Sequence, residues 1–259
     1  MEEAIRQIER DGYCILRRVY DAGQVRRALD LVGVWLSKTA GRVTSNLPAM
    51  ATDPIVWNLQ NKDVYFLELL LGQASIERIL VHFLNDTWYR RIPSGQPNYI
   101  LRAYVARSGL VPLPLHIDSF VPYRGEHLIS MQCAIMLEDM RQARGATLVI
   151  PRSHRSGTYA EQAASTDAIP IEAHAGDVVL WDSRLWHGAA PNDSGETRWA
   201  LIATFTRWWI KQAFDITGNL PAAIYEQLST NQKAILGFCS IPQQMLEQLG
   251  DHTRVEFFV

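Results

Sequence analysis

The segment Leu113-Pro114-Leu115-His116-Ile117-Asp118 is the stretch from which this chain is best interpreted. Its composition predicts a short extended segment, in which residues i and i+2 lie on the same face. The imidazole of His116 and the carboxylate of Asp118 could then reach one metal ion. A His-x-Asp triplet alone is weak evidence for a metal site, because about 0.4 such triplets are expected by chance in a chain of this composition. A buried histidine bonded to a nearby carboxylate is the ordinary alternative.

A second segment, 175–188, supplies another histidine. It opens with a Gly-Asp turn, continues as an apolar strand and places His187 at the end of a β-rich stretch. Turn residues follow, and the strand predicted over 197–208 begins with Arg198. A hairpin between these strands would bring Arg198 back beside His187.

Together these residues predict a metal site. Two imidazoles and one carboxylate on one face of a metal leave three positions open, which is the arrangement of non-haem Fe(II) oxygenases. His116, Asp118 and His187 supply that set. Arg198 would hold an organic co-substrate, because its planar fork can bind a carboxylate through two parallel hydrogen bonds. A surface arginine at the start of a strand is the alternative.

Further motifs make the chain resemble the phytanoyl-CoA dioxygenase-like branch of the Fe(II)- and 2-oxoglutarate-dependent oxygenases. The similarity extends over roughly residues 8–210, and its segments are Asp11-Gly12-Tyr13-Cys14-Ile15-Leu16, His116-Ile117-Asp118, 145–154, 176–181, Trp186-His187-Gly188-Ala189, Pro191-Asn192 and Arg198. In this family the distal histidine precedes the 2-oxoglutarate arginine by a similar interval, here 11 residues.

The resemblance implies an α+β fold, a double-stranded β-helix (cupin-like jelly roll) with flanking amino- and carboxy-terminal helices. We expect a single domain over 1–259, with the jelly-roll core at about 98–210 and helical parts at 1–97 and 211–259. No linker-like stretch divides the chain, and at 47% hydrophobic residues it can bury a full core.

The resemblance also implies the chemistry. The cofactor would be Fe(II), bound by His116, Asp118 and His187, with 2-oxoglutarate and O2 as co-substrates. Arg198 would bind the keto acid, which is converted to succinate. Gln132 and Thr147 are further candidates for hydrogen bonds to it, or else polar groups satisfied within the barrel. Since halogenating relatives replace the carboxylate ligand with a small residue, the presence of Asp118 favours hydroxylation.

Two positions depart from the family pattern. Arg152 stands where the family's Pro-Gly-Ser-His motif has glycine, which could reshape the adjacent loop. Ile117, between the two proximal ligands, removes a side-chain hydrogen bond that a polar residue could make there.

Periodicity and turn residues predict the remaining elements. Helices are expected at 2–11, ending at Gly12, from Asp21 to about Thr39, and within 62–84, with Ser75 as a cap between two of them. Tail helices are expected to start near Pro221 and Ser229. Strands are expected at 98–106, 126–137, 146–150, 177–185 and 198–208.

Composition limits the partners. The formal charge is −2, and arginine pairs are scattered among acidic residues, which argues against nucleic acid. Three cysteines without metal-type spacing, no signal-peptide pattern and no membrane-length apolar run lead us to expect a cytoplasmic protein without membrane contact. The oligomeric state is not predicted.

The substrate is expected to be a small molecule, either a specialised metabolite or an amino-acid-like compound. Loops at 40–61, 88–97, 107–112, 119–125 and 155–166 could surround the metal and carry Trp57, Trp88, Tyr89, Phe120 and Tyr123, whose alternative role is packing against the barrel. An anionic substrate could meet Arg90, Arg91 or Arg102. The remaining histidines singled out as structural are His82, His154, His174 and His252.

Two other function classes stay open. One is a cupin-type metal enzyme that does not use 2-oxoglutarate, such as a hydrolase or isomerase. The other is a catalytically silent binding protein of the same fold, although such a protein would be expected to have lost a metal ligand.

Overall fold

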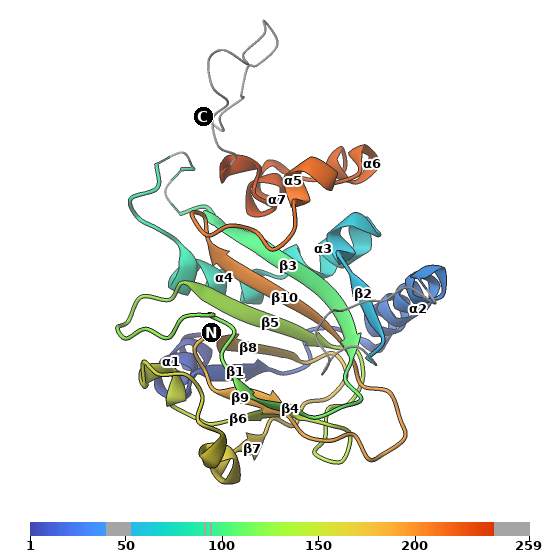
Figure 1. Ribbon diagram of the computed structural model, residues 1–259. Helices are drawn as coiled ribbons and strands as arrows, with labels where there is room; N and C mark the ends of the chain where they lie inside the picture. Colours follow the sequence, from blue (N-terminus) through green and yellow to red (C-terminus); the bar gives the residue numbers. More distant parts are fainter. Residues whose placement is uncertain (40–52, 91, 94, 241–259) are drawn as a thin grey trace, which may run out of the picture.

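The computed structural model describes residues 1–39, 53–90, 92–93 and 95–240. In this part of the chain two antiparallel sheets face each other, and helices cover the far side of the larger one (Figure 1). This is the α+β jelly roll with flanking helices that the resemblance predicts. The segments 40–52 and 241–259, including His252, and residues 91 and 94 lie outside the described residues.

The larger sheet has six strands. They are β1 (Tyr13–Leu16), β2 (Ile55–Trp57), β3 (Tyr99–Ser108), β5 (Ser130–Met136), β8 (Val178–Asp182) and β10 (Trp199–Arg207), in the spatial order β1-β8-β5-β10-β3-β2. Two of its strands thus come from the part of the chain before residue 98. The smaller sheet contains β4 (Leu113–His116), β6 (Thr147–Val149), β7 (Ile169–Pro170) and β9 (His187–Ala189), in the order β4-β9-β6-β7.

The longer helices precede most of the strands. They are α1 (Glu2–Asp11), α2 (Ala22–Thr39), α3 (Val64–Leu71) and α4 (Ala74–Leu84), and their apolar side chains form one core with the outer face of the larger sheet. Three short helices follow the last strand: α5 (Ile216–Asn219), α6 (Ala222–Tyr225) and α7 (Thr230–Ile235). None of the described helices has both the length and the apolar character needed to cross a membrane.

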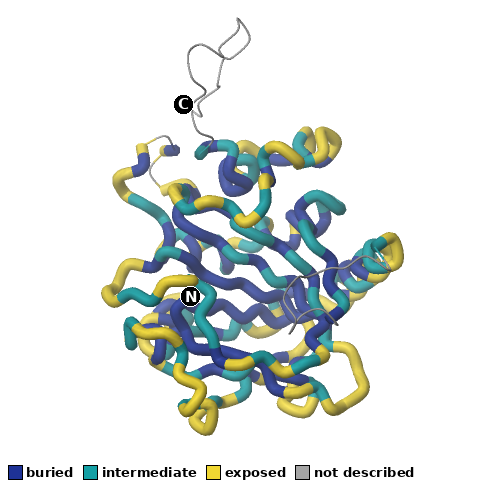
Figure 2. The backbone as a smooth tube through the Cα atoms, viewed as in Figure 1, coloured by how far each residue is buried: buried dark blue, intermediate teal, exposed yellow. Residues whose placement is uncertain are grey.

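The central strands are covered on both faces. Every residue of β5 and β8 is buried, and the dark-blue tube marks this layer in Figure 2. Cys133 of β5 packs with the helices, whereas its neighbour Ala134 packs between the sheets together with Trp181 of β8. This double coverage explains why both strands carry apolar residues on both faces.

Several helix ends follow their predicted signals. Gly12 ends α1 in the left-handed conformation, with φ of 90°. The capping box of α2 is present, because the backbone N–H of Asp21 donates to the Gln24 side chain and the N–H of Gln24 donates to the Asp21 carboxylate. Ser229 forms a second capping box at the start of α7. The prediction for Ser75 is wrong: Gln73 precedes α4, and Ser75 lies inside the helix.

The predicted hairpin is also wrong. β9 belongs to the smaller sheet and β10 to the larger one, so the chain crosses between sheets after His187 instead of folding back beside it. The turn signal at 192–195 marks that crossing. Strand lengths differ too, since the strand expected at 126–137 starts only at Ser130 and the one expected at 177–185 ends at Asp182.

Candidate metal centre

The smaller sheet brings the three predicted metal ligands together. His116 is the last residue of β4, His187 is the first of β9, and the two residues are directly paired across the strands. Side chains paired in this way lie on the same face, about 5 Å apart at Cβ. Asp118 lies in the turn that follows β4. The end of strand β4 therefore positions His116, and the turn after it positions Asp118.

The ligand atoms converge on one point. Nε2 of His187 lies 3.2 Å from Asp118 Oδ2, and Nε2 of His116 lies 3.7 Å from Asp118 Oδ1. The imidazole centroids are 4.2 Å apart, and one ligand atom from each residue lies within 4.8 Å of the others. The His187 side chain is 7% exposed, whereas those of His116 and Asp118 are 38% and 29% exposed. The site is thus anchored in the protein on one side and open on the other.

Backbone carbonyls fix the two imidazoles. Nδ1 of His116 lies 2.9 Å from the carbonyl oxygen of Pro114, and Nδ1 of His187 lies 2.9 Å from that of Leu185. A proton on each Nδ1 satisfies these contacts and leaves both Nε2 atoms with lone pairs directed toward Asp118. Metal-binding histidines usually make such a contact, in which the ring nitrogen that does not bind the metal donates to a backbone carbonyl oxygen.

The carboxylate between the imidazoles is held as an anion. Burial alone would raise the pKa of Asp118, but the His187 and His116 rings outweigh burial and lower it. Burial acts against the cation of His187, yet Asp118 outweighs it and raises the pKa of that ring. Burial, together with the His187 ring, lowers the pKa of His116. One carboxylate and two imidazoles with these tendencies form a donor set suited to a divalent first-row metal.

Two backbone features keep the centre compact. The N–H groups of Asp118 and Ser119 both donate to the carbonyl oxygen of Ser183, at 2.8 and 3.0 Å, which ties the ligand turn to the end of β8. Gly188 allows β4 to approach β9 closely, because a Cβ atom there would lie 2.6 Å from the Leu113 carbonyl oxygen. Neither contact has a sequence signature except the glycine that follows His187.

Arg198 is partly buried, and its guanidinium forms no ion pair with a carboxylate among the described residues. Its backbone N–H donates to Ser108 Oγ, and its Nη1 approaches only the sulfur of Met140, at 3.7 Å. Its Nε is buried and has no hydrogen-bond partner among the described residues. Burial and the nearby Arg107 guanidinium lower the pKa of Arg198 to about 10. An interior cation without a partner is costly, so this arrangement fits an anionic ligand.

Met140 links Arg198 to the smaller sheet. The same sulfur lies 3.5 Å from both the backbone nitrogen and the hydroxyl of Thr147. Thr147 pairs with Ala189, and Val149 on the same strand pairs with His187. Thr147 and Arg198 therefore contact the same sulfur atom, and Thr147 lies on a strand that is paired with the strand of His187. No motif in the sequence singles out Met140.

Gln132 lies on the inner face of the larger sheet. It is buried and is paired with Trp181 on one side and with Thr204 on the other. The Thr204 hydroxyl donates to its amide oxygen at 2.8 Å. The Trp181 ring packs edge-on against His187, with centroids 5.6 Å apart. Gln132 is thus close to the centre by way of Trp181, but its oxygen already has a partner.

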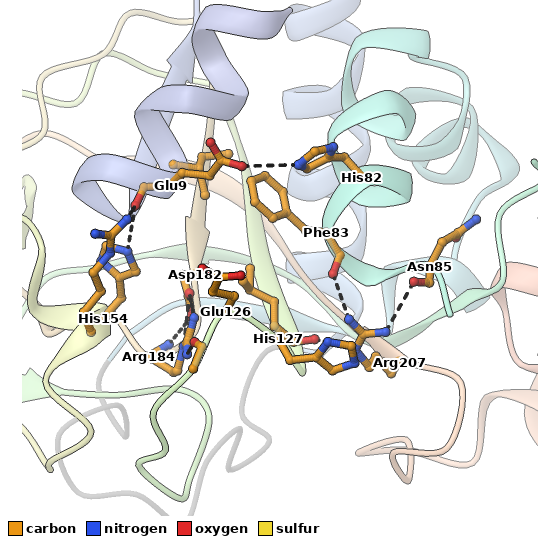
Figure 3. A pocket seen from close by; sticks show the side chains of 14 residues that line it. Glu9, His82, Phe83, Asn85, Glu126, His127, His154, Asp182, Arg184 and Arg207 are labelled. Carbon is orange, nitrogen blue, oxygen red and sulfur yellow. Dashed lines mark hydrogen bonds and ion pairs between the residues drawn. The ribbon is translucent and has the colours of Figure 1, made fainter. Parts of the chain in front are cut away.

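A separate polar cavity of about 760 Å³ lies between α1, α4 and the loop before β5 (Figure 3). Its two central arginines are already bonded within the protein. Arg184 donates to the Asp182 carboxylate and the Gly125 carbonyl oxygen, and Arg207 donates to three backbone carbonyl oxygens. None of the three metal-ligand candidates lines this cavity. The arginines that line this cavity therefore hold the surrounding backbone, and the cavity is not an extension of the metal centre.

The loop aromatics fall into different environments. Trp57 belongs to strand β2 rather than to a loop, and Tyr89 is buried and stacked on Trp208. Tyr123 packs against the Arg184 guanidinium. Phe120 and Trp88 remain exposed, and Phe120 comes two residues after Asp118.

Other predicted departures have local explanations. Arg152 adopts φ of 72°, the left-handed conformation that a glycine would favour, so the substitution keeps the backbone shape at a conformational cost. His154 is buried with Nε2 near the Glu9 carbonyl oxygen, and His82 and His174 lie beside Glu9 and Asp139. None of these three belongs to a described metal cluster.

Known proteins share sequence and fold with this chain. The sequence profile described as phytanoyl-CoA dioxygenase matches residues 8–200. A relative named dioxygenase af480, from Aspergillus fumigatus, is 25% identical over 93% of this chain and 78% of its own length. An uncharacterized protein of Mycobacterium tuberculosis, Rv1501, is 31% identical over 119 residues, 44% of this chain and 42% of the relative. The chain thus matches less than half of the length of that mycobacterial relative.

Solved structures share the fold at low identity. The epimerase SnoN in complex with Fe3+, alpha ketoglutarate and nogalamycin RO has a TM-score of 0.63 and 19% identity, covering 85% of this chain and 90% of its own. HygX from Streptomyces hygroscopicus, with nickel and 2-oxoglutarate bound, also has a TM-score of 0.63, at 13% identity, covering 82% and 89%. These similarities establish the jelly roll.

Proposed function

The chain belongs to the phytanoyl-CoA dioxygenase family, and from this premise we propose that it is an Fe(II)- and 2-oxoglutarate-dependent oxygenase of a small-molecule substrate. The observation that carries the proposal is the convergence of His116, Asp118 and His187, together with a partly buried Arg198 that forms no ion pair with any described residue. Hydroxylation is the reaction we favour, because the carboxylate ligand that halogenating relatives lack is present as Asp118.

The donor set fits the metal that the family implies. Two neutral imidazoles held through Nδ1 and one carboxylate would occupy one face of Fe(II). When bound with 2-oxoglutarate, such an iron supplies oxidation of a C–H bond by O2, with decarboxylation of the keto acid to succinate. Asp118 offsets part of the metal's charge, and the open side of the site gives access to the co-substrates and the substrate.

Arg198 would hold the distal carboxylate of 2-oxoglutarate. Its backbone N–H is held by Ser108 Oγ, its guanidinium contacts the Met140 sulfur, and it forms no ion pair with any residue that the structure describes. Two parallel N–H donors suit a carboxylate and orient it along a defined axis. Thr147 is the better-placed additional donor, because its hydroxyl contacts only the Met140 sulfur, whereas the Gln132 amide oxygen is engaged by Thr204.

The direct test is an anaerobic titration of the metal-free protein with Fe(II) and then with 2-oxoglutarate. The expected result is a visible charge-transfer band of the chelated keto acid, which requires higher 2-oxoglutarate concentrations in Arg198→Ala. Iron binding without a band would contradict the proposal and favour a metal enzyme that does not use 2-oxoglutarate. Failure to bind Fe(II) would favour a catalytically silent relative.

A further inference from the structure

Arg102 occupies an irregular position in the larger sheet. In the pairing of β3 with β10, Leu101 lies opposite Phe205 and Ala103 lies opposite Thr204, which leaves Arg102 as an extra residue without a partner on β10. This is a β-bulge, a feature that redirects a side chain and that occurs often beside active sites.

The side chain of Arg102 points toward the residues that follow the first metal ligands. Its guanidinium carbon lies 4.8 Å from the ring centroid of Phe120. Phe120 comes two residues after Asp118, has φ of 63° and is 65% exposed. Its turn is tied to the Ser183 carbonyl oxygen through the N–H groups of Asp118 and Ser119. The turn therefore holds an aromatic ring and a guanidinium together beside a metal ligand.

Arg102 differs in its contacts from three other partly buried arginines outside the proposed keto-acid site. Arg107 is paired with Asp53, Arg184 with Asp182, and Arg207 with backbone carbonyls. The Arg102 guanidinium makes no hydrogen bond or ion pair with any residue that the structure describes, apart from its contact with the Phe120 ring. Burial lowers the pKa of Arg102, and the charge of Asp118 opposes this effect. The charge is thus held near the metal ligands while its five donors stay available.

We propose that Arg102 binds an anionic oxygen group of the substrate, and that an apolar or aromatic part of the same molecule packs against Phe120. The inference rests on the proposed oxygenase function and names its substrate class: a small molecule with a carboxylate, sulfate or phosphate group beside an apolar body. A planar guanidinium binds such groups through paired hydrogen bonds, and an adjacent exposed ring adds apolar contact. Arg198 remains reserved for the keto acid.

The test uses 4-fluorophenylacetate as an anionic probe and 4-fluorophenylacetamide as its neutral counterpart. Binding is measured by 19F NMR titration of the full chain loaded with Zn(II) and 2-oxoglutarate. The same titration with Fe(II) under anaerobic conditions reports proximity to the metal through faster 19F relaxation. The anion is expected to bind and to relax faster with Fe(II), and Arg102→Met is expected to weaken binding by at least about tenfold. The amide should bind weakly to both proteins.

Matched variants keep the test decisive. Arg124→Met removes an exposed arginine of the same loop region and should leave binding unchanged, while Arg102→Lys should retain part of it because the charge remains. Unchanged binding in Arg102→Met, or no binding of the anion to the parent at millimolar concentration, would overturn the proposal.

The charge-transfer band separates this inference from the proposed function. If the parent forms the band and Arg102→Met loses it, Arg102 holds the keto acid and the substrate assignment is wrong. If the parent forms no band, the oxygenase function fails, while the Zn(II) titration still reports whether Arg102 binds the anion.

Discussion

The guanidinium of Arg198 fills the space that a side chain at Gly109 would occupy: a Cβ atom there would lie 2.3 Å from Arg198 Nη2. Gly109 directly follows β3, whose last residue, Ser108, accepts a hydrogen bond from the Arg198 backbone. The segment Ser108-Gly109 thus holds the backbone of Arg198 and leaves space for its guanidinium. The position of the charge depends on the absence of a methyl group.

Gly109→Ala should therefore weaken 2-oxoglutarate binding while leaving the protein folded. The atom that must move is the far end of a flexible side chain, so the cost to the fold is small, but the guanidinium loses its alignment. We expect at least about a tenfold higher 2-oxoglutarate concentration for half-formation of the charge-transfer band. Gly33→Ala in α2, where an added Cβ meets nothing within 4 Å, is the control. An unchanged titration in Gly109→Ala would show that Arg198 does not bind the keto acid.

Arg198→Met should make the ligand-free protein more stable. The parent keeps a largely desolvated cation that forms no ion pair with any described residue, and an apolar side chain of similar length removes that penalty. We expect a gain of about 0.5–2 kcal/mol in the free energy of unfolding, measured by denaturant titration of the metal-free protein. With Zn(II) and 2-oxoglutarate at 100 times its Kd, the parent should gain about 2.7 kcal/mol and the variant much less. A variant that is less stable without ligand would contradict this account.

His187→Ala should remove metal binding without unfolding the chain. This imidazole contacts Asp118, His116 and Trp181, and it lies on the buried side of the centre. Loss of one ligand should lower Fe(II) affinity by more than about 100-fold and abolish 2-oxoglutarate turnover. His174→Ala, at an exposed histidine beside Asp139, should bind iron as the parent does. Iron affinity from a competition titration and far-ultraviolet circular dichroism check both points, and full activity in His187→Ala would refute the ligand assignment.

Sequence reasoning selected three residues that converge in the structure, because much of their signal is local. His116 and Asp118 are two residues apart, and the strand and turn they require are encoded in the residues around them. The hairpin prediction failed because adjacency along the chain does not show which sheet a strand joins. β9 pairs with β4 and β6, and both of these strands lie far from it in the sequence. The bulge at Arg102 likewise depends on the register with β10.

Contacts made by the backbone were beyond reach for a different reason. The carbonyl groups of Pro114, Leu185 and Ser183 orient the ligands, and every residue carries such a group. Met140 was missed because a lone methionine between Asp139 and Arg141 gives no sign that its sulfur will contact Arg198 and Thr147. Ser75 was preferred as a cap on propensity, whereas packing of α4 placed the helix start at Ala74.

Asp177→Asn should lower stability in a pH-dependent way. The Asp177 carboxylate is buried and accepts hydrogen bonds from the backbone of Arg18 and His174 and from the Arg17 side chain, at 2.8–2.9 Å. Burial alone would raise its pKa, but these donors outweigh burial and lower it. Because the folded-state pKa is below the unfolded value, the carboxylate's contribution is fully present above the unfolded pKa. It is lost as the pH falls through the folded pKa.

The asparagine variant should therefore be less stable than the parent by about 1–3 kcal/mol at pH 7. The difference should shrink steadily below about pH 4, where the parent's carboxylate becomes protonated. Denaturant unfolding of both proteins between pH 7 and pH 3 measures it, and Asp193→Asn at an exposed turn position is the control. A stability difference that stays constant across this range would contradict the assignment of this contribution to the ionised carboxylate of Asp177, which joins the end of β1 to the start of β8.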